Sequence, residues 1–150
     1  MTGRDEKAKA YFLEGYNCAQ AVALAFADFC GMPEDQLARL ASGFGGGMGR
    51  LREVCGAFSG AVMVYGLLHG YDDPTARQEK KELYATIQQM AERFRAENGA
   101  LTCRDLLGGS PSSDPTPSER TAGYYKKRPC ADLAASAASI LEQILNDPAL

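Results

Sequence analysis

The sequence predicts an all-α fold in which residues 1–150 form a single domain, a helical bundle of about five helices with a glycine-rich loop before the central helix. Alanine-rich and apolar residues recur at helical spacing, with capping residues or prolines before them and glycines after them. No run alternates between apolar and polar residues as a β-strand does. With 45% hydrophobic and 23% charged residues, the composition is that of an ordinary globular protein.

The first predicted helix spans about residues 17–30. Asn17 is a favourable N-cap residue, the run after it is rich in alanine, and Gly31 suits the C-terminal end. Pro33 predicts the first turn of a second, shorter helix that ends at the following glycines. The segment over residues 4–14 is charged and short, and no element is assigned to it.

A glycine-rich loop over residues 43–50 precedes the central helix. Its glycines permit positive φ angles at almost every position, which suits unusual backbone geometry. The segment 55–69 follows, with small or apolar side chains on nearly every face, and is predicted to be a buried helix that its neighbours approach closely. Gly56 and Gly60 lie four residues apart in it.

Two longer helices and one short turn complete the predicted bundle. Asp73 and Pro74 predict an N-cap and a first turn, and an apolar stripe carries that helix to about residue 97. Residues 102–108 fit one capped helical turn, and prolines and serines then predict a loop. Pro129 opens the last helix, which Pro148 is expected to stop.

Charge and hydropathy exclude some classes of partner. The formal net charge is −3 and the sequence pI is near 5.2, so a nucleic-acid partner is not expected. No apolar run reaches the roughly 18 residues of a membrane-spanning helix, so membrane insertion is not expected either. The first residues are charged and lack the apolar core of a secretory signal, which makes the cytoplasm the expected location.

Four of the five cysteines fall at predicted helix starts, namely Cys18, Cys55, Cys103 and Cys130. Free backbone N–H groups and the positive end of a helix dipole stabilise a thiolate, which is the form that acts as a nucleophile or a metal ligand. Cys30 lies instead at a helix C-terminus, where the dipole opposes a thiolate, and is expected to be an ordinary thiol. An odd number of cysteines argues against a purely structural disulfide framework.

The spacing of these four cysteines leaves several kinds of site open. Successive members lie far apart along the chain, so folding must bring them together. The paired knuckles of zinc fingers and ribbons, the C-x-x-C of thioredoxin-like sites and the bacterial ferredoxin spacing are all absent. The four sulfurs are therefore compatible with redox disulfides, an iron–sulfur cluster, a zinc site, or simple burial in alanine-rich helices.

The cysteines and the segment Cys55-Gly56-Ala57-Phe58-Ser59-Gly60 resemble the C_GCAxxG_C_C family, whose members are described as redox-active. The resemblance covers about residue 17 to the last helix. This chain reads Cys-Gly-Ala where the family label has Gly-Cys-Ala, and Cys30 has no counterpart in the pattern. The resemblance implies a bacterial or archaeal redox protein with Cys18, Cys55, Cys103 and Cys130 as its working residues.

The glycine-rich loop is a second candidate site. Consecutive backbone N–H groups can form an anion-binding nest, and Arg50 and Arg52 follow the glycines, so Gly45, Gly46, Gly47 and Arg50 are candidate cofactor-binding residues. The loop lacks the G-K-[ST] ending of a P-loop and the glycine spacing of a dinucleotide fingerprint. A small anion or a substrate carboxylate remains compatible with it.

The leading hypothesis is a redox protein in which the four cysteines converge and act by thiol–disulfide exchange or through an iron–sulfur cluster, with Cys55 as the most reactive thiol and an unknown redox partner. Whether it is an enzyme or an electron carrier stays open. The alternative is a non-enzymatic module with a four-cysteine zinc site or buried cysteines. A homodimer through the glycine-rich helix is also expected. His69 is interpreted as a helix C-terminal residue, and residues 124–128 as a solvated loop.

Overall fold

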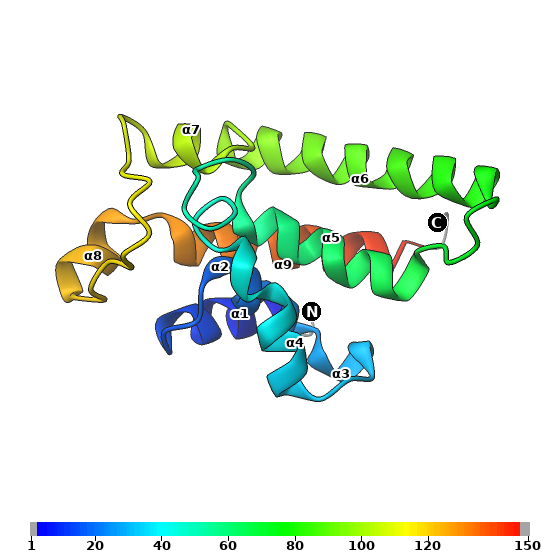
Figure 1. The fold of residues 1–150 in the computed structure, drawn as a ribbon, viewed down its shortest axis with the longest axis horizontal. Helices are drawn as coiled ribbons and strands as arrows, with labels where there is room; N and C mark the ends of the chain where they lie inside the picture. Colours follow the sequence, from blue (N-terminus) through cyan, green and yellow to red (C-terminus); the bar gives the residue numbers. More distant parts are fainter. Residues whose placement is uncertain (1–2, 148–150) are drawn as a thin grey trace.

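The computed structural model describes residues 3–147, and within this range it contains helices α1 to α9 and no β-strand (Figure 1). The predicted all-α class is confirmed. Three long helices, α5 (Gly56–His69), α6 (Arg77–Asn98) and α9 (Cys130–Leu145), run along the length of the molecule. No helix among the described residues is both long and apolar enough to cross a membrane.

The core forms where α2 (Cys18–Ala25) packs against α5, α9 and α1 (Arg4–Leu13). Nearly every residue of α2 is buried, because its alanines allow helices to approach from several sides. The largest fully buried side chains come from α2, α5, α6 and α9 and from the residue that ends α2: Val22, Phe26, Val64, Met90, Phe94, Leu141 and Ile144.

Two glycines of α5 allow α2 to come close. A Cβ atom at Gly60 would lie 2.6 Å from the carbonyl oxygen of Ala19, and one at Gly56 would lie 2.7 Å from Cys18 Sγ. Both distances are shorter than side chains tolerate, so glycine is required at these positions. The two glycines of the sequence motif therefore serve the packing that sets Cys18 against the start of α5.

The predicted helix over residues 17–30 is wrong in one respect, since it is divided into α2 and α3 (Ala27–Cys30). The Ala25 carbonyl accepts a hydrogen bond from Arg4 Nη1, and the Phe29 N–H donates to Phe26 instead of to Ala25. Because Arg4 takes the Ala25 carbonyl, the hydrogen bond from the Phe29 N–H to Ala25 O is not formed, and the helix is interrupted between α2 and α3.

The predicted start of α6 at Asp73 is also wrong, because the helix begins at Arg77. The backbone N–H and the hydroxyl of Thr75 both donate to Asp73 Oδ1, which makes a local turn in place of a helix cap. The number of helices also exceeds the predicted five, because α1 and α8 (Ala122–Lys127) occupy segments to which the sequence analysis assigned no helix. The predicted shorter helix after Pro33 is α4 (Glu34–Ala41), and the predicted capped turn is α7 (Cys103–Leu107).

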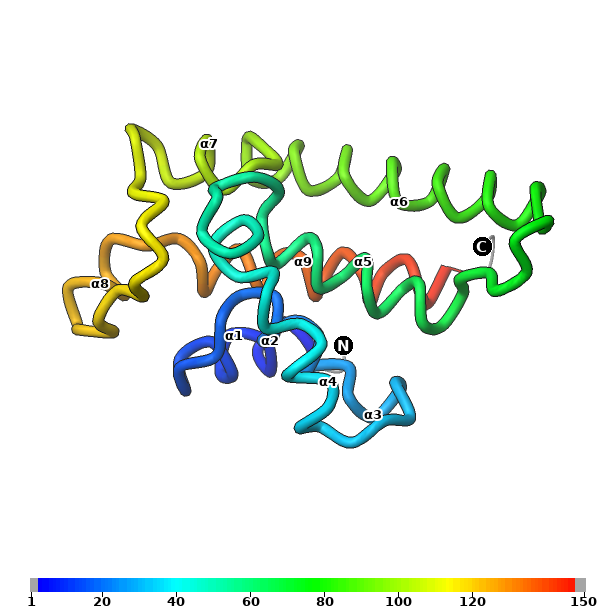
Figure 2. The backbone as a smooth tube through the Cα atoms, in the orientation of Figure 1, coloured from blue at the N-terminus to red at the C-terminus, as the bar shows by residue number. Residues whose placement is uncertain are grey.

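The helix starts that carry a cysteine lie at one end of the bundle. The backbone trace shows α5 and α9 starting at the same end, where the glycine-rich loop, α7 and α8 also lie (Figure 2). A short 3-10 turn, η1 (Ser42–Phe44), leads from α4 into that loop. α9 ends at Leu145, and Pro148, the expected stop, lies outside the described residues.

Candidate functional site

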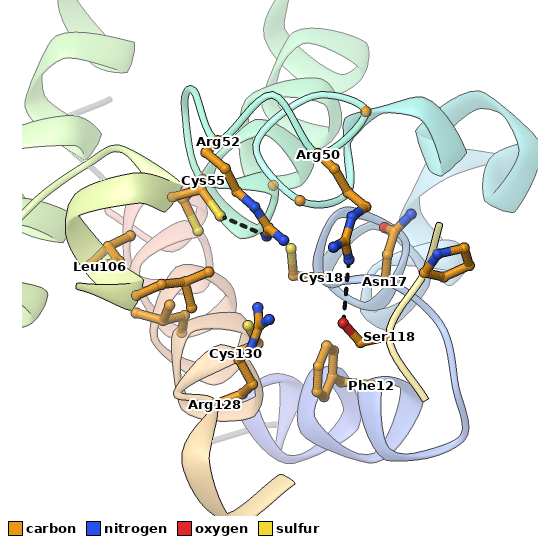
Figure 3. A pocket seen from close by; sticks show the side chains of 18 of the residues that line it. Phe12, Asn17, Cys18, Arg50, Arg52, Cys55, Leu106, Ser118, Arg128 and Cys130 are labelled. Atoms are coloured by element: carbon orange, nitrogen blue, oxygen red, sulfur yellow. Dashed lines mark hydrogen bonds between the residues drawn. The ribbon is translucent and has the colours of Figure 1, made fainter. Parts of the chain in front are cut away.

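All four candidate cysteines line one cavity of about 400 Å³ at this end of the bundle (Figure 3). Each stands where the sequence placed it. Cys18, Cys103 and Cys130 are the first residues of α2, α7 and α9, and Cys55 is the N-cap residue of α5. The expectation that these cysteines begin helices is confirmed, as is the position of Cys30 at the end of α3.

Side-chain caps hold the starts of two of these helices, α2 and α7. Asn17 and Gln20 form a reciprocal capping box at the start of α2, and Thr102 Oγ1 accepts from the Asp105 N–H at the start of α7. Such caps satisfy the free N–H groups of a first turn and hold its residues in place. The backbone that carries Cys18 and Cys103 is consequently held at the two helix starts.

An isolated antiparallel bridge between Val54 and Thr102 joins the start of α5 to the start of α7. The Cys55 N–H donates to Leu101 O at 2.9 Å, and the Cys103 N–H donates to Glu53 O at 2.6 Å. A Cβ at Gly47 would lie 2.7 Å from Cys103 Cβ, so the glycine-rich loop also packs on this junction. Cys55 and Cys103, distant in sequence, become neighbours.

The thiols of Cys18 and Cys55 interact across the contact between α2 and α5. A hydrogen bond from Cys55 lowers the pKa of the Cys18 thiol to about 7, with help from backbone N–H groups of Gly46 and Ala57 and against the opposing effect of burial. The same hydrogen bond and burial raise the pKa of Cys55 well above its ordinary value. We expected Cys55 to be the more reactive thiol, whereas the hydrogen bonds favour Cys18 as the thiolate.

The other thiols differ from this pair. Burial, followed by repulsion from a charged Cys18, raises the pKa of Cys130 to about 12, which keeps it protonated near neutral pH. Burial and the nearby Asp28 raise the pKa of Cys30, which lies away from the cavity. The thiolate form of Cys30 is therefore disfavoured, in line with its expected place at a helix C-terminus.

Arg52 is buried beside the sulfurs, and no carboxylate of residues 3–147 forms an ion pair with it. Its Nη1 donates to Cys103 Sγ at 3.5 Å and its Nε donates to Ser112 O at 2.9 Å. Nη2 is buried and has no hydrogen-bond partner. A buried guanidinium group with an unused donor is costly unless something occupies that donor.

Three more arginines line the same cavity: Arg50, Arg120 and Arg128. No aspartate or glutamate lines it, and no ion pair within residues 3–147 involves any of the four arginines. Burial, and then repulsion by Arg52 and Arg128, lower the pKa of Arg50. The cavity is thus strongly cationic in a chain whose net charge is −3.

The glycine-rich loop differs from the predicted anion nest. The N–H groups of Gly49, Arg50 and Arg52 donate to carbonyls within the loop, and that of Gly46 is directed at the Cys18 sulfur. Gly45, Gly46 and Arg50 line the cavity, whereas Gly47 packs against the Cys103 segment. The loop therefore stabilises the Cys18 thiolate through the Gly46 N–H and contributes the side chains of Arg50 and Arg52 to the cavity. Most of its other N–H groups bond to carbonyls of the loop and are not free to bind an anion.

Sequence reasoning missed the residues that the C-terminal third contributes. Tyr124 and Arg128, expected in a solvated loop, belong to α8 and its C-cap and line the cavity together with Arg120. Thr121 Oγ1 accepts from the Tyr124 N–H, a cap that was readable from the sequence. His69 ends α5, stacks on Tyr65 and takes no part in the cavity.

A comparison with known protein families matches residues 16–144 to the family described as "Putative redox-active protein (C_GCAxxG_C_C)". The match spans all five cysteines, the glycine-rich loop and α9 up to Ile144. No curated protein and no solved structure matches the chain.

Proposed function

The chain belongs to the C_GCAxxG_C_C family, and from this premise we propose that it is a thiol–disulfide oxidoreductase whose working pair is Cys18 and Cys55. The observation that carries the proposal is the close packing of the starts of α2 and α5, which places the Cys18 and Cys55 thiols together in one cavity, where the pKa of Cys18 is lowered to about 7. A thiol with a pKa near the ambient pH is the most effective attacking group in disulfide exchange.

The reaction proceeds in two exchanges. The Cys18 thiolate attacks one sulfur of a substrate disulfide, which forms a mixed disulfide on Cys18 and releases one substrate thiolate. Cys55 then attacks Cys18 Sγ, forms the Cys18–Cys55 disulfide and releases the second substrate sulfur, while the Cys55 proton passes to one of the two leaving groups. Two electrons move from the protein dithiol to the substrate.

The surroundings of the pair suit this chemistry. The sulfurs lie at the N-terminal ends of α2 and α5, where backbone N–H groups stabilise the charge of the attacking thiolate. Cys130 is held as a neutral thiol in the same cavity, and Arg52 places a positive charge beside Cys103. Cys103 is therefore the thiol placed to attack the Cys18–Cys55 disulfide in a further exchange, whereas a protonated Cys130 is a poor nucleophile.

Two metal-based alternatives, an iron–sulfur cluster and a zinc site, would use the same four sulfurs. Both need at least three ligands arranged around one point. Among residues 3–147, no three Cys, His, Asp or Glu side chains are grouped in that way. The arrangement of the donors therefore favours the dithiol, and the iron and zinc content of protein purified without oxygen decides between the versions.

The test is the number of free thiols before and after exposure to 2-hydroxyethyl disulfide, measured by alkylation and intact mass. The wild-type protein is expected to lose thiols on oxidation and to regain them on reduction. Cys18→Ser and Cys55→Ser are expected to abolish the internal disulfide, and Cys30→Ser, the matched control, to retain it. A wild-type protein whose thiols all remain free would overturn the proposal.

A further inference from the structure

We propose that the cavity takes a small organic disulfide that carries a carboxylate group, and that Arg52 binds this carboxylate beside the working sulfurs. The inference rests on the proposed function and specifies its substrate class. The juxtaposition that points to it is a buried, unpartnered guanidinium nitrogen and four cysteines in one cavity without acidic side chains.

Arg52 carries the argument. Its side chain is buried, its Nε and Nη1 are occupied by Ser112 O and Cys103 Sγ, and only Nη2 has no acceptor. An oxygen of a bound carboxylate would satisfy that nitrogen and neutralise the charge, which is the pairing that guanidinium groups favour. Within the described residues, no protein carboxylate is placed to do so.

The remaining charges of the cavity have the same sign. Arg50 donates to Asp114 O and to Ser118 Oγ, the second of which is drawn in Figure 3, and Arg120 donates to two backbone carbonyls. These bonds use neutral acceptors, so they hold the side chains without cancelling their charge. Asp114 attracts Arg50 electrostatically, but its exposed carboxylate lies outside the cavity lining and accepts from the Thr116 N–H.

The size and depth of the cavity favour a small molecule over a protein disulfide. Its volume of about 400 Å³ lies in the range of small-molecule pockets. Cys18, Cys55 and Cys103 are 8%, 4% and 9% exposed, so a disulfide fixed in the surface of a folded protein has little access to them. A flexible, compact disulfide can enter.

The test uses three disulfides of similar size and different charge: 3,3′-dithiodipropionate, 2-hydroxyethyl disulfide and cystamine. Each rate of thiol exchange is expressed relative to the rate of the same disulfide with free cysteine, because the three leaving thiols differ in pKa. This relative rate is expected to fall in the order given, with the anionic compound about tenfold faster than the cationic one, as one charge-assisted hydrogen bond provides. The net negative charge of the chain attracts the cationic disulfide and repels the anionic one. A preference for the anionic compound therefore reports the charge of the cavity and not the net charge of the protein.

Arg52→Met is expected to bring the three rates close together. Arg39→Met, which removes an equal charge from the exposed surface of α4, is the matched control and is expected to keep the wild-type order. Arg128→Met provides a second cavity variant with a smaller expected loss, should Arg52→Met fail to fold. Equal rates in the wild-type protein, a preference for cystamine, or an unchanged order in the cavity variants would overturn the inference.

A binding measurement separates this inference from the proposed function. Suberate resembles dithiodipropionate but has no disulfide, and 1,6-diaminohexane resembles cystamine in the same way. Suberate is expected to raise the unfolding temperature of the reduced wild-type protein and not that of Arg52→Met, and the diamine to raise neither. If none of the disulfides reacts, the proposed function fails and suberate binding alone decides the site; absence of a suberate effect then overturns it.

Discussion

Two arginines are buried to nearly the same degree in this protein, and their surroundings are opposite. Arg4 is 5% exposed and Arg52 is 3% exposed. Arg4 forms an ion pair with Asp28 through both terminal nitrogens, donates to Ala25 O and packs on two aromatic rings. In the part of the chain that the structure describes, Arg52 has no carboxylate partner and its Nη2 donates no hydrogen bond.

The cysteines of the two regions differ in the same sense. Near Arg4, burial and Asp28 raise the pKa of Cys30. In the cavity with Arg52, a hydrogen bond from Cys55 and backbone N–H groups lower the pKa of Cys18 to about 7. Where the protein neutralises its own buried charge, the ion pair stabilises the fold and the pKa of the neighbouring Cys30 is raised. Where the charge has no carboxylate partner among the described residues, we propose a reactive sulfur and a ligand site.

The largest expected effect comes from removing the Cys55 thiol, whose hydrogen bond is the main reason that the pKa of Cys18 is lowered while that of Cys30 is raised. In Cys55→Ala, the pKa of Cys18 rises from about 7 toward the ordinary thiol value of about 8.5, because the hydrogen bond from Cys55 is the main cause of the lowering. The pH midpoint of Cys18 alkylation by iodoacetamide measures this change. Cys30→Ala is the control, and a midpoint that stays near pH 7 in Cys55→Ala would contradict the assignment.

The next effect compares the two arginines by the same substitution. Arg4→Met is expected to lower the free energy of unfolding by about 2 kcal/mol, because it leaves the buried Ala25 carbonyl without its donor and removes the ion pair. Arg52→Met is expected to change it by less than about 1 kcal/mol, because it removes a buried charge that has no counter-ion. Urea unfolding measures both.

The pH dependence of Arg4→Met follows from Asp28. The hydrogen bond and charge of Arg4 lower the pKa of Asp28, so the pair contributes stability above the unfolded pKa of about 3.9 and loses it as the pH falls through the lowered value. The difference in free energy of unfolding between wild type and Arg4→Met should therefore become smaller as the pH falls through this value.

Equal losses in the free energy of unfolding for Arg4→Met and Arg52→Met at neutral pH would contradict the comparison of the two arginines.

The smallest effect is the difference in reactivity between Cys18 and Cys30 at pH 7. The two thiols are almost equally exposed, so access does not separate them. The lowered pKa of Cys18 and the raised pKa of Cys30 give Cys18 the larger share of thiolate at this pH. The weaker nucleophilicity of a more acidic thiol offsets part of this advantage. Iodoacetamide is expected to label Cys18 about tenfold faster than Cys30, and peptide mass spectrometry measures the two rates. Equal rates of labelling would contradict the difference in reactivity between the two thiols.

The cysteine positions were predictable because capping residues and prolines mark helix starts locally. Asn17, Thr102 and Pro129 each precede a cysteine that begins a helix, and all three starts are confirmed. The convergence of these starts was only a hypothesis, because no local pattern records that a glycine at position 56 brings Cys18 against α5.

The arginines of the cavity were less predictable. Arg52 is buried by a loop in which Met48, Arg50 and Arg52 all adopt positive φ, a conformation that side chains with a Cβ rarely take and that the neighbouring glycines do not reveal. Arg120 and Arg128 come from a stretch without helical periodicity. The charge of the site therefore depends on tertiary contacts that sequence patterns do not encode.

The most direct test of the account is to identify which sulfurs become joined when the reduced protein is oxidised. Protein treated with a small disulfide, alkylated and digested is analysed by peptide mass spectrometry for cross-linked cysteine peptides. The account predicts a link between the peptides of Cys18 and Cys55, with Cys30 alkylated. A link that involves Cys30, or full alkylation of both Cys18 and Cys55, would contradict it.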